Sequence, residues 1–174
     1  DQDRAKAIGG EFAAVTDDLV GFDALVARMD DLELLHEMAR EEGDEAQEPE
    51  IDAELTAVTR KLDELELRSL FTGPHDEADA ICGVNAKDGG VDAQHWAEML
   101  LRMYSRWAES RGFQLEVDDV SQGAEAGILS AEFTIKGRYA YGLMGAERGV
   151  HRLVRISPFD GNARRQTSFA GVEV

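Results

Sequence analysis

The chemically richest part of the sequence is the stretch of residues 149–168. Ser157 and Pro158 favour an extended backbone that enters a turn, and residues 160–162 complete a loop that tolerates positive φ angles. Because arginines hold phosphate, planar groups stack on bases and hydroxyls meet base edges, the side chains of this loop are typical of single-stranded RNA recognition. They are Ser157, Phe159, Arg164, Arg165, Gln166 and Thr167. The Ser157 hydroxyl can pair with guanine O6 or with the adenine amino group, although a plain surface turn is the alternative interpretation.

A second candidate site is the glycine pair Gly89-Gly90, which precedes a strongly amphipathic segment. Backbone N–H groups are free at a helix N-terminus, so this turn can hold an anion or the polar edge of a base. Asp92 falls in the first helical turn, where a carboxylate stabilises a helix through capping and through the helix dipole. The third glycine of a dinucleotide-binding fingerprint is missing. A purely structural turn is the competing interpretation.

Metal ligands and nucleophiles are not arranged for catalysis in this sequence. The histidines lack a second ligand at a suitable spacing, and they are His36, His75, His95 and His151. Cys82 lies in an apolar strand candidate, which indicates a buried and inert thiol. The many carboxylates fall on helix surfaces without forming an acid–base pair. We therefore expect no catalytic set, no metal site and no cofactor.

The elements that position these residues begin with helices. In the first half of the chain, apolar residues recur at spacings of three and four, which predicts helices with Gly21 or Asp30-Asp31 as candidate breaks. The apolar positions are Phe12, Val15, Leu19, Phe22, Val26 and Met29, followed after an acidic turn by Ile51, Leu55, Val58, Leu62 and Leu65. We interpret them as the core of an antiparallel hairpin of two or three helices.

The second half changes period and predicts an α+β fold. A strand over residues 79–85 precedes a helix over residues 91–110. Its expected buried face consists of Trp96, Met99, Leu100, Met103 and Trp107. Further strands are predicted over residues 113–117, 128–136 and 167–174, with an irregular arginine-rich stretch before the last. These elements predict a sheet with at least one long helix packed on it.

The charge of the chain divides at the same place. Residues 1–80 hold 7 basic and 24 acidic residues, a net charge of −17, whereas residues 81–174 hold 11 and 12, a net charge of −1. Clustered Lys and Arg provide phosphate affinity, and only residues 149–165 carry such a cluster, with a local charge of +3. The acidic helices form either a solvated surface or a docking face for a basic protein. Because Gly73-Pro74 ends helices, we expect an acidic helical domain at residues 1–73 and an α+β domain at residues 74–174.

Length and composition exclude other classes of protein. The 174 residues suffice for a buried core, and no apolar run reaches the roughly 20 residues of a membrane span, so we expect no membrane association. A single cysteine fits a reducing cytoplasm. The first residue is Asp1 rather than Met, which we interpret as a fragment or a processed chain.

Several segments resemble bacterial class I peptide chain release factors. They are residues 138–142, 147–160 and 164–169, with further matches at residues 65–68, 89–104 and 106–112. The tripeptide Ser157-Pro158-Phe159 is similar to that of the type called release factor 2, which reads the stop codons UAA and UGA. The sister factor carries a Pro-x-Thr-like tripeptide and reads UAA and UAG.

The resemblance implies that Ser157, Pro158 and Phe159 form a codon-recognition loop. The Ser157 hydroxyl would read the purine at the second codon position. The helix N-terminus at Gly90 and Asp92 would read the first uridine, largely through backbone geometry.

The resemblance also implies roles for the residues after this loop. Thr167 would meet the third base, beside the stacking position at Gln166, while Arg164 and Arg165 would hold the RNA backbone. The family usually has His at the stacking position and Glu in the first helical turn, where this chain has Gln166 and Asp92. A planar amide can lie against a base but has no aromatic ring.

By this resemblance the function is translation termination in the cytoplasm. The implied partners are a ribosome with UAA or UGA in its decoding site, ribosomal RNA and protein, and the class II release factor GTPase. The family's hydrolytic tripeptide Gly-Gly-Gln occurs nowhere in the sequence, so we expect an incomplete decoding domain that is not an enzyme by itself. Two alternatives are a release-factor homologue that regulates without hydrolysis by binding RNA or ribosomes, and an acidic helical adaptor for a basic protein.

Overall fold

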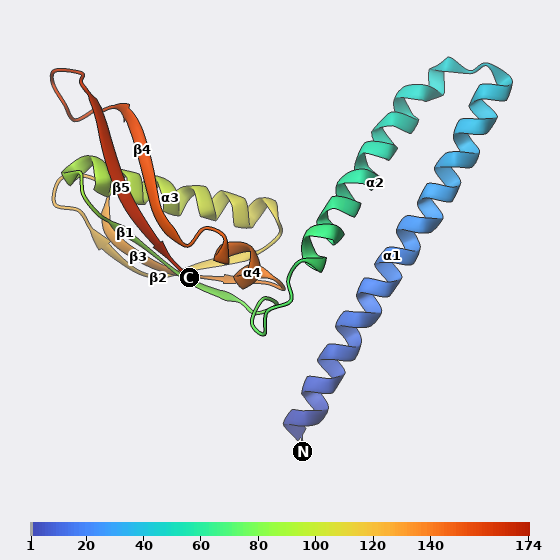
Figure 1. Ribbon diagram of the computed structural model, residues 1–174, viewed down its shortest axis with the longest axis horizontal. Helices are drawn as coiled ribbons and strands as arrows, with labels where there is room; N and C mark the ends of the chain where they lie inside the picture. The colour runs from blue at the N-terminus through green and yellow to red at the C-terminus, as the bar shows by residue number, and fades with distance from the viewer. Residues whose placement is uncertain (1) are drawn as a thin grey trace. The chain divides into compact units, whose positions relative to one another are not determined.

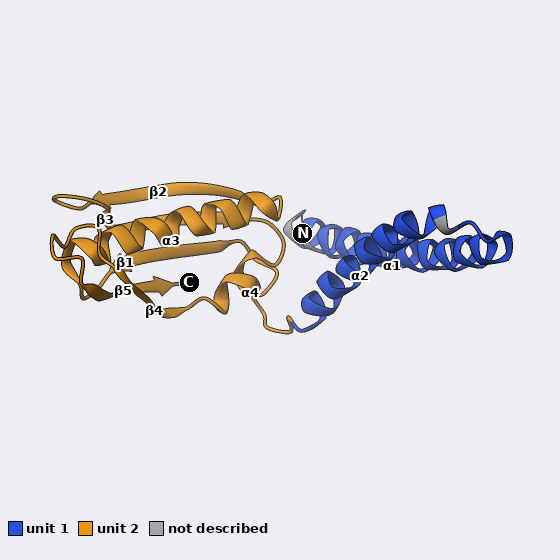
Figure 2. Ribbon diagram, turned by 90° about the horizontal axis from the view of Figure 1, so that it is seen from above, with its two compact units in different colours: residues 1–70 blue, residues 71–174 orange. Residues whose placement is uncertain are grey.

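The computed structural model describes residues 2–174, which form two compact units that meet between Leu70 and Phe71 (Figure 2). Among the helices of this described part, none combines the length and the apolar character that a membrane crossing requires.

The first unit is an antiparallel helical hairpin (Figure 1). Helix α1 (Gln2–Glu42) and helix α2 (Glu48–Ser69) are joined by a turn that contains the short 3-10 helix η1 (Glu45–Gln47). Gly43 directly follows α1 and has a φ of +67°. The proline in the first turn of α2 fits the start of a helix, because no backbone N–H is needed there. A small core holds the hairpin together, made of Leu32, Ala39, Ile51 and Val58 with Leu25 and Leu35 beside them.

Helix α1 runs without a break, so the prediction that Gly21 or Asp30-Asp31 ends it is wrong. The expected core role of its N-terminal stripe is also wrong, since Phe12 is 73% exposed and Val15, Leu19, Phe22, Val26 and Met29 are exposed as well. The two helix lengths explain the exposure of Phe12, Val15 and Leu19, because at about 1.5 Å per residue the 41 residues of α1 extend far beyond the 22 residues of α2. Phe22, Val26 and Met29 lie off the packed face of α1, which carries Leu25, Leu32, Leu35 and Ala39.

The second unit is an antiparallel sheet with the strand order β2-β3-β1-β5-β4. The strands are β1 (Ala80–Ala86), β2 (Gln114–Gln122), β3 (Ile128–Lys136), β4 (Gly149–Ile156) and β5 (Arg165–Glu173). Helix α3 (Gly90–Ser110) crosses one face of this sheet, and the short helix α4 (Ala140–Gly145) connects β3 to β4 (Figure 1). The predicted α+β class is therefore confirmed.

The core of the second unit lies between α3 and the sheet. Leu100 of α3 meets inward-facing residues of three strands, among them Cys82, Phe133 and Val172, which are at most 2% exposed. Successive strand residues point to opposite faces, so Ile81, next to the buried Cys82, is 72% exposed. The expectation of a buried Cys82 is confirmed, and burial raises the pKa of its thiol to about 11.

The buried face of α3 differs from the predicted one. Of the five predicted residues only Leu100 is fully buried, and Met103 is 45% exposed. The face that meets the sheet is lined by Asp92, Ala93, Ala97, Leu100, Tyr104 and Ala108. Alanines let the helix backbone approach the strands closely, and the larger Trp96, Met99 and Trp107 side chains pack along its flanks, where they are half-buried.

The arginine-rich stretch predicted to be irregular is the edge strand β4. It pairs with β5 over its whole length, from Gly149 opposite Val172 to Ile156 opposite Arg165. The half-buried positions of β4 include His151 and Arg155. Because these inward-facing residues are polar, the strand lacks the alternation of apolar and polar residues by which strands are recognised in a sequence. The predicted strands at β1, β2, β3 and β5 are present, and β3 has the predicted bounds.

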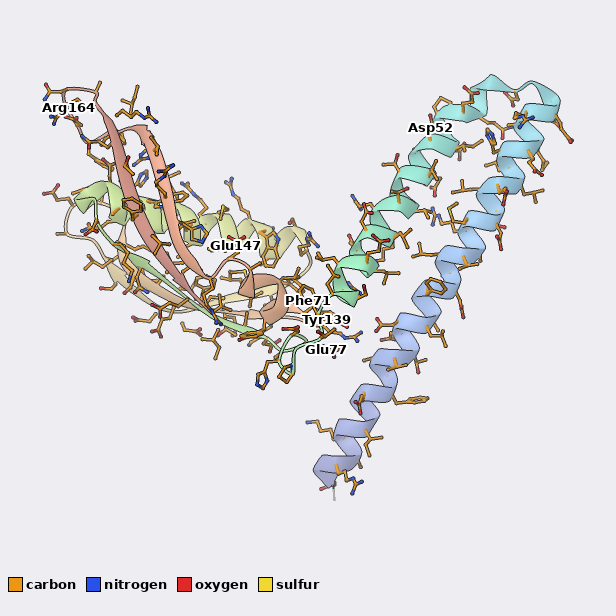
Figure 3. The ribbon with its side chains drawn as sticks, in the orientation of Figure 1. Asp52, Phe71, Glu77, Tyr139, Glu147 and Arg164 are labelled. Carbon is orange, nitrogen blue, oxygen red and sulfur yellow. The ribbon has the colours of Figure 1, made fainter. Side chains whose placement is uncertain are left out.

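The segment that leads into β1 is tied to the chain around α4. Glu77 accepts hydrogen bonds from Arg138 Nη2 at 3.2 Å and from Tyr139 Oη at 3.1 Å, and the rings of Phe71 and Tyr139 stack with centroids 5.7 Å apart (Figure 3). These contacts fix the start of the second unit to its own sheet.

Candidate functional site

Three segments, two of them contiguous and the third distant in sequence, converge at one end of the sheet. They are the turn before α3, the loop of residues 157–164 between β4 and β5, and the first residues of β5 (Figure 1). The turn and β5 are joined by backbone hydrogen bonds, from the Lys87 N–H to the Phe169 carbonyl at 2.9 Å and from the Phe169 N–H to the Asp88 carbonyl at 3.0 Å. The two candidate sites found separately in the sequence are therefore neighbours.

The turn before α3 depends on its two glycines. Gly89 has φ +129° and Gly90 has φ +58°, values that side-chain-bearing residues rarely adopt. A Cβ on Gly89 would come within 3.1 Å of Ser168 Oγ and 3.2 Å of Ser168 Cα. Around Gly90, by contrast, there is open space. The start of α3 thus presses against β5 on one side and leaves its first residue accessible on the other.

Asp92 lies in the first turn of α3, as predicted, and it is 9% exposed. Its Oδ1 accepts a hydrogen bond from Arg155 Nη2 at 2.7 Å, which makes a largely enclosed ion pair. The carboxylate therefore joins α3 to β4, in addition to its favourable place near the positive end of the helix dipole.

The loop of residues 157–164 differs from the expected exposed turn in one respect, because Ser157 is only 3% exposed. Its Oγ accepts a hydrogen bond from the Phe159 N–H at 3.1 Å. The Phe159 side chain is 46% exposed, and Pro158 is exposed beside it. Since a hydroxyl that accepts one bond retains its own proton and a second lone pair, Ser157 can still donate and accept.

Asp160 organises the far side of this loop. Its two carboxylate oxygens accept from Arg164 Nε at 2.8 Å, from the Asn162 N–H at 3.1 Å and from Gln166 Nε2 at 3.2 Å. These bonds, above all the one from the Arg164 side chain, hold the pKa of Asp160 well below its usual range. Charged acceptors make the stronger hydrogen bonds, so the loop has a well-defined internal shape.

The cationic and amide side chains of the site remain largely accessible. The Arg164 side chain is 67% exposed although it pairs with Asp160, and Figure 3 places it at the tip of the β4–β5 hairpin. Arg165 and Thr167 are exposed, and Gln166 is half-buried. The amide group of Gln166 is held by Asp160, which fixes the orientation of its plane.

Sequence reasoning missed three residues that join these segments: His95, Arg155 and Asp160. Arg155 Nη2 lies 2.9 Å from His95 Nδ1, and the His95 ring meets the Phe159 ring edge-on with centroids 5.5 Å apart. The signal was present in the spacing of Asp92 and His95, because residues three apart share one face of a helix. Within residues 2–174 no group of three or more potential metal ligands is found.

Comparison with known proteins identifies the family. The model of the PCRF domain family matches residues 1–172. The chain belongs to the PCRF domain family. Peptide chain release factor 2 of Salinispora arenicola is 48% identical over 174 residues, which cover all of this chain and 47% of that protein. Peptide chain release factor 2 of Mycobacterium avium is 49% identical over 176 residues, with 100% and 48% covered.

A solved structure agrees with this assignment. Release factor 2 of Thermus thermophilus is 50% identical, with a TM-score of 0.64 over 85% of this chain and 43% of that chain. The resemblance to release factors deduced from residues 138–169 is thus confirmed. This PCRF chain spans about half the length of the curated relatives it matches.

Proposed function

We propose that this chain is the part of a type 2 release factor that recognises the stop codons UAA and UGA in the decoding site of the ribosome. Recognition leads to release of the nascent peptide in the cytoplasm. The observation that carries the proposal is the convergence of the Gly90 turn, the loop of Ser157 and Phe159, and Thr167 at one end of the sheet. A codon is three adjacent bases, and three adjacent segments can each meet one of them.

The first base meets the start of α3. The backbone N–H groups of a helix N-terminus point outward, and the open space beside Gly90 lets a uridine approach them. The carbonyl oxygens of uracil are hydrogen-bond acceptors, so backbone N–H donors favour uracil without the help of any side chain. Asp92 contributes to recognition of the first base indirectly, by holding the turn in position, because its carboxylate is bonded to Arg155.

The second base meets Ser157. Its hydroxyl has a proton for guanine O6 and a free lone pair for the adenine amino group, which accounts for equal acceptance of UGA and UAA. Phe159 and Pro158 supply an exposed apolar wall beside the base. The Phe159 N–H already points to Ser157 Oγ, so the hydroxyl oxygen is oriented before the codon binds.

The third base meets Thr167, next to the amide plane of Gln166. Arg164 and Arg165 hold the phosphate backbone of the RNA, and a charge of +3 over residues 149–165 is enough because the ribosome itself holds the codon in place. The acidic hairpin of α1 and α2 faces basic ribosomal protein, and the unit of residues 71–174 faces the codon. Ribosomal RNA and the class II release factor GTPase complete the set of partners.

Ester hydrolysis is assigned to residues outside this sequence. The Gly-Gly-Gln tripeptide on which the family's hydrolytic activity depends does not occur in these 174 residues. We infer that this chain reads the codon and is not itself an enzyme.

The proposal is tested with the full-length protein and ribosomes programmed with UAA, UGA, UAG or the sense codon UGG. Release of a labelled peptide is expected on UAA and UGA and at background level on UAG and UGG. Codon-independent release, or equal release on UAG, would contradict the proposal. Ribosome binding without release on any codon would instead favour a non-hydrolytic regulator.

A further inference from the structure

Arg155 joins the codon-recognition loop to helix α3. It lies near the end of β4, two residues before Ser157, and its side chain bonds to residues of α3. Its Nη2 donates to Asp92 Oδ1 at 2.7 Å and lies 2.9 Å from His95 Nδ1. The Arg155 and Asp92 side chains are 22% and 11% exposed, so little water competes for these bonds.

The two bonds use both protons of one nitrogen. A guanidinium group has donors and no acceptor, so in this contact Arg155 Nη2 donates and His95 Nδ1 accepts. Asp92 and His95 lie three residues apart on one face of α3, and Arg155 bridges them. Arg155 Nε is enclosed without an acceptor, so the Nη2 bonds carry the connection, with a weaker contact from Nη1 to Met99 Sδ at 3.7 Å.

His95 extends the connection to the loop itself. Its ring meets Phe159 at a centroid distance of 5.5 Å and an interplanar angle of 86°, an edge-to-face arrangement. Inside the loop, Ser157 and Asp160 fix the shape through their own hydrogen bonds. Internal bonds define the shape of the loop. The contacts of Arg155 and His95 with α3 hold the loop near the Gly90 turn, in addition to the backbone bonds between that turn and β5.

We propose that Arg155 is a positioning residue for codon recognition, which acts through Asp92 and His95 to hold the recognition loop at a fixed distance from the N-terminus of α3. This inference rests on the proposed function. It follows that the first and second codon positions are read by one rigid unit. Loss of Arg155 therefore weakens discrimination between stop and sense codons, beyond any effect on stability.

The test uses the full-length protein with the substitutions Arg155→Met, Arg155→Lys and His95→Phe, and the double variant Arg155→Met/His95→Phe. Methionine keeps much of the side-chain length without donors, lysine keeps the charge and the donors, and phenylalanine keeps a ring beside Phe159 without the Nδ1 acceptor. Arg102→Met is the matched control, because Arg102 is exposed on α3. The measured quantity is kcat/KM for peptide release on UGA and on the near-cognate sense codon CGA, which differs at the first position.

Arg155→Met is expected to lower kcat/KM on UGA about tenfold, mainly through KM, and to reduce the UGA-to-CGA ratio by a similar factor. Arg155→Lys should recover part of this loss. The double variant should lose about as much as Arg155→Met alone, because both substitutions remove the same connection. Arg102→Met should keep the wild-type ratio.

A UGA-to-CGA ratio within about twofold of wild type in folded Arg155→Met overturns the inference, whatever the change in stability. If circular dichroism shows that Arg155→Met does not fold, the same threshold is applied to His95→Phe. Failure of the proposed function is distinguishable, since the wild-type protein would then release peptide without preference for UAA and UGA.

Discussion

Gly89 lies directly against Ser168, so close that a Cβ on Gly89 would come within 3.2 Å of the Ser168 Cα. This contact joins the turn before α3 to β5, and it brings the Gly90 turn beside the strand that carries Gln166 and Thr167. Gly89 has no side chain and Ser168 is buried, yet their close approach sets the geometry of the site.

Substituting Gly89→Ala should lower the free energy of unfolding by about 1–3 kcal/mol. Alanine would be strained at a φ of +129°, and its Cβ would crowd the Ser168 backbone. Gly145→Ala is the control, since nothing lies within 4 Å of a Cβ there. Both tryptophans lie on α3, so urea unfolding followed by their fluorescence reports on the second unit. Equal stability of the two variants would contradict this contact.

The close packing of α3 on the sheet predicts that Ala97→Leu is destabilising. Ala97 is fully buried, and a leucine there would force the helix away from the strands, at about 1–3 kcal/mol. Met103→Leu, at a position that is 45% exposed, should change stability by less than about 0.5 kcal/mol. Urea unfolding followed by tryptophan fluorescence compares the stability of the two variants. If Met103→Leu were the more harmful of the two, the buried face read from the sequence would be correct after all.

The helices and strands were predicted from the sequence more accurately than the faces that these elements bury. The α+β class, the hairpin and the bounds of β3 all follow from apolar periodicity. The buried face of α3 does not, because hydropathy ranks tryptophan and methionine above alanine, whereas a close helix–sheet contact selects small residues such as Ala93 and Ala97. Strand β4 was missed for a similar reason, since Arg155 occupies an inward-facing position and is compensated by Asp92.

The hydrogen bonds of Asp160 predict a pH-dependent stability. The pKa of Asp160 is lowered in the folded protein, so the unfolded chain binds more protons as the pH falls below about 4, and the folded state loses stability there. The contribution is fully present above the unfolded pKa. Asp160→Asn removes it, so the difference in unfolding free energy between wild type and Asp160→Asn should shrink as the pH falls from 5 toward about 2. A difference that does not vary with pH would show that these bonds are absent in solution.

The burial of Cys82 predicts that its thiol does not react with thiol reagents until the second unit unfolds. Burial leaves it 1% exposed and raises its pKa to about 11, so the thiolate is scarce at pH 8 and reagents cannot reach it. Labelling with a chromogenic disulfide reagent should therefore be negligible in buffer and stoichiometric in about 6 M guanidinium chloride, a concentration at which most domains unfold. Rapid labelling of the native protein would mean that β1 is not covered by α3.

The residues of the site were found in the sequence, but their connections were not. Ser157, Phe159, Gly90 and Thr167 lie together in the structure, although separate turns suggested them. The Ser157 hydroxyl accepts a bond from a backbone N–H two residues away, whereas the link from Phe159 to α3 depends on His95, 64 positions earlier in the chain. The second contact arises from tertiary packing, which residue spacing within one segment does not encode.

The central claim is that the loop of Ser157, Pro158 and Phe159 reads the second codon position and, beside Thr167, sets which stop codons are accepted. The most direct measurement replaces this tripeptide by Pro-Ala-Thr in the full-length protein and compares peptide release on UGA- and UAG-programmed ribosomes. The account predicts that release on UGA falls and release on UAG appears, while release on UAA persists. Release on UGA that is unchanged by the replacement would contradict it.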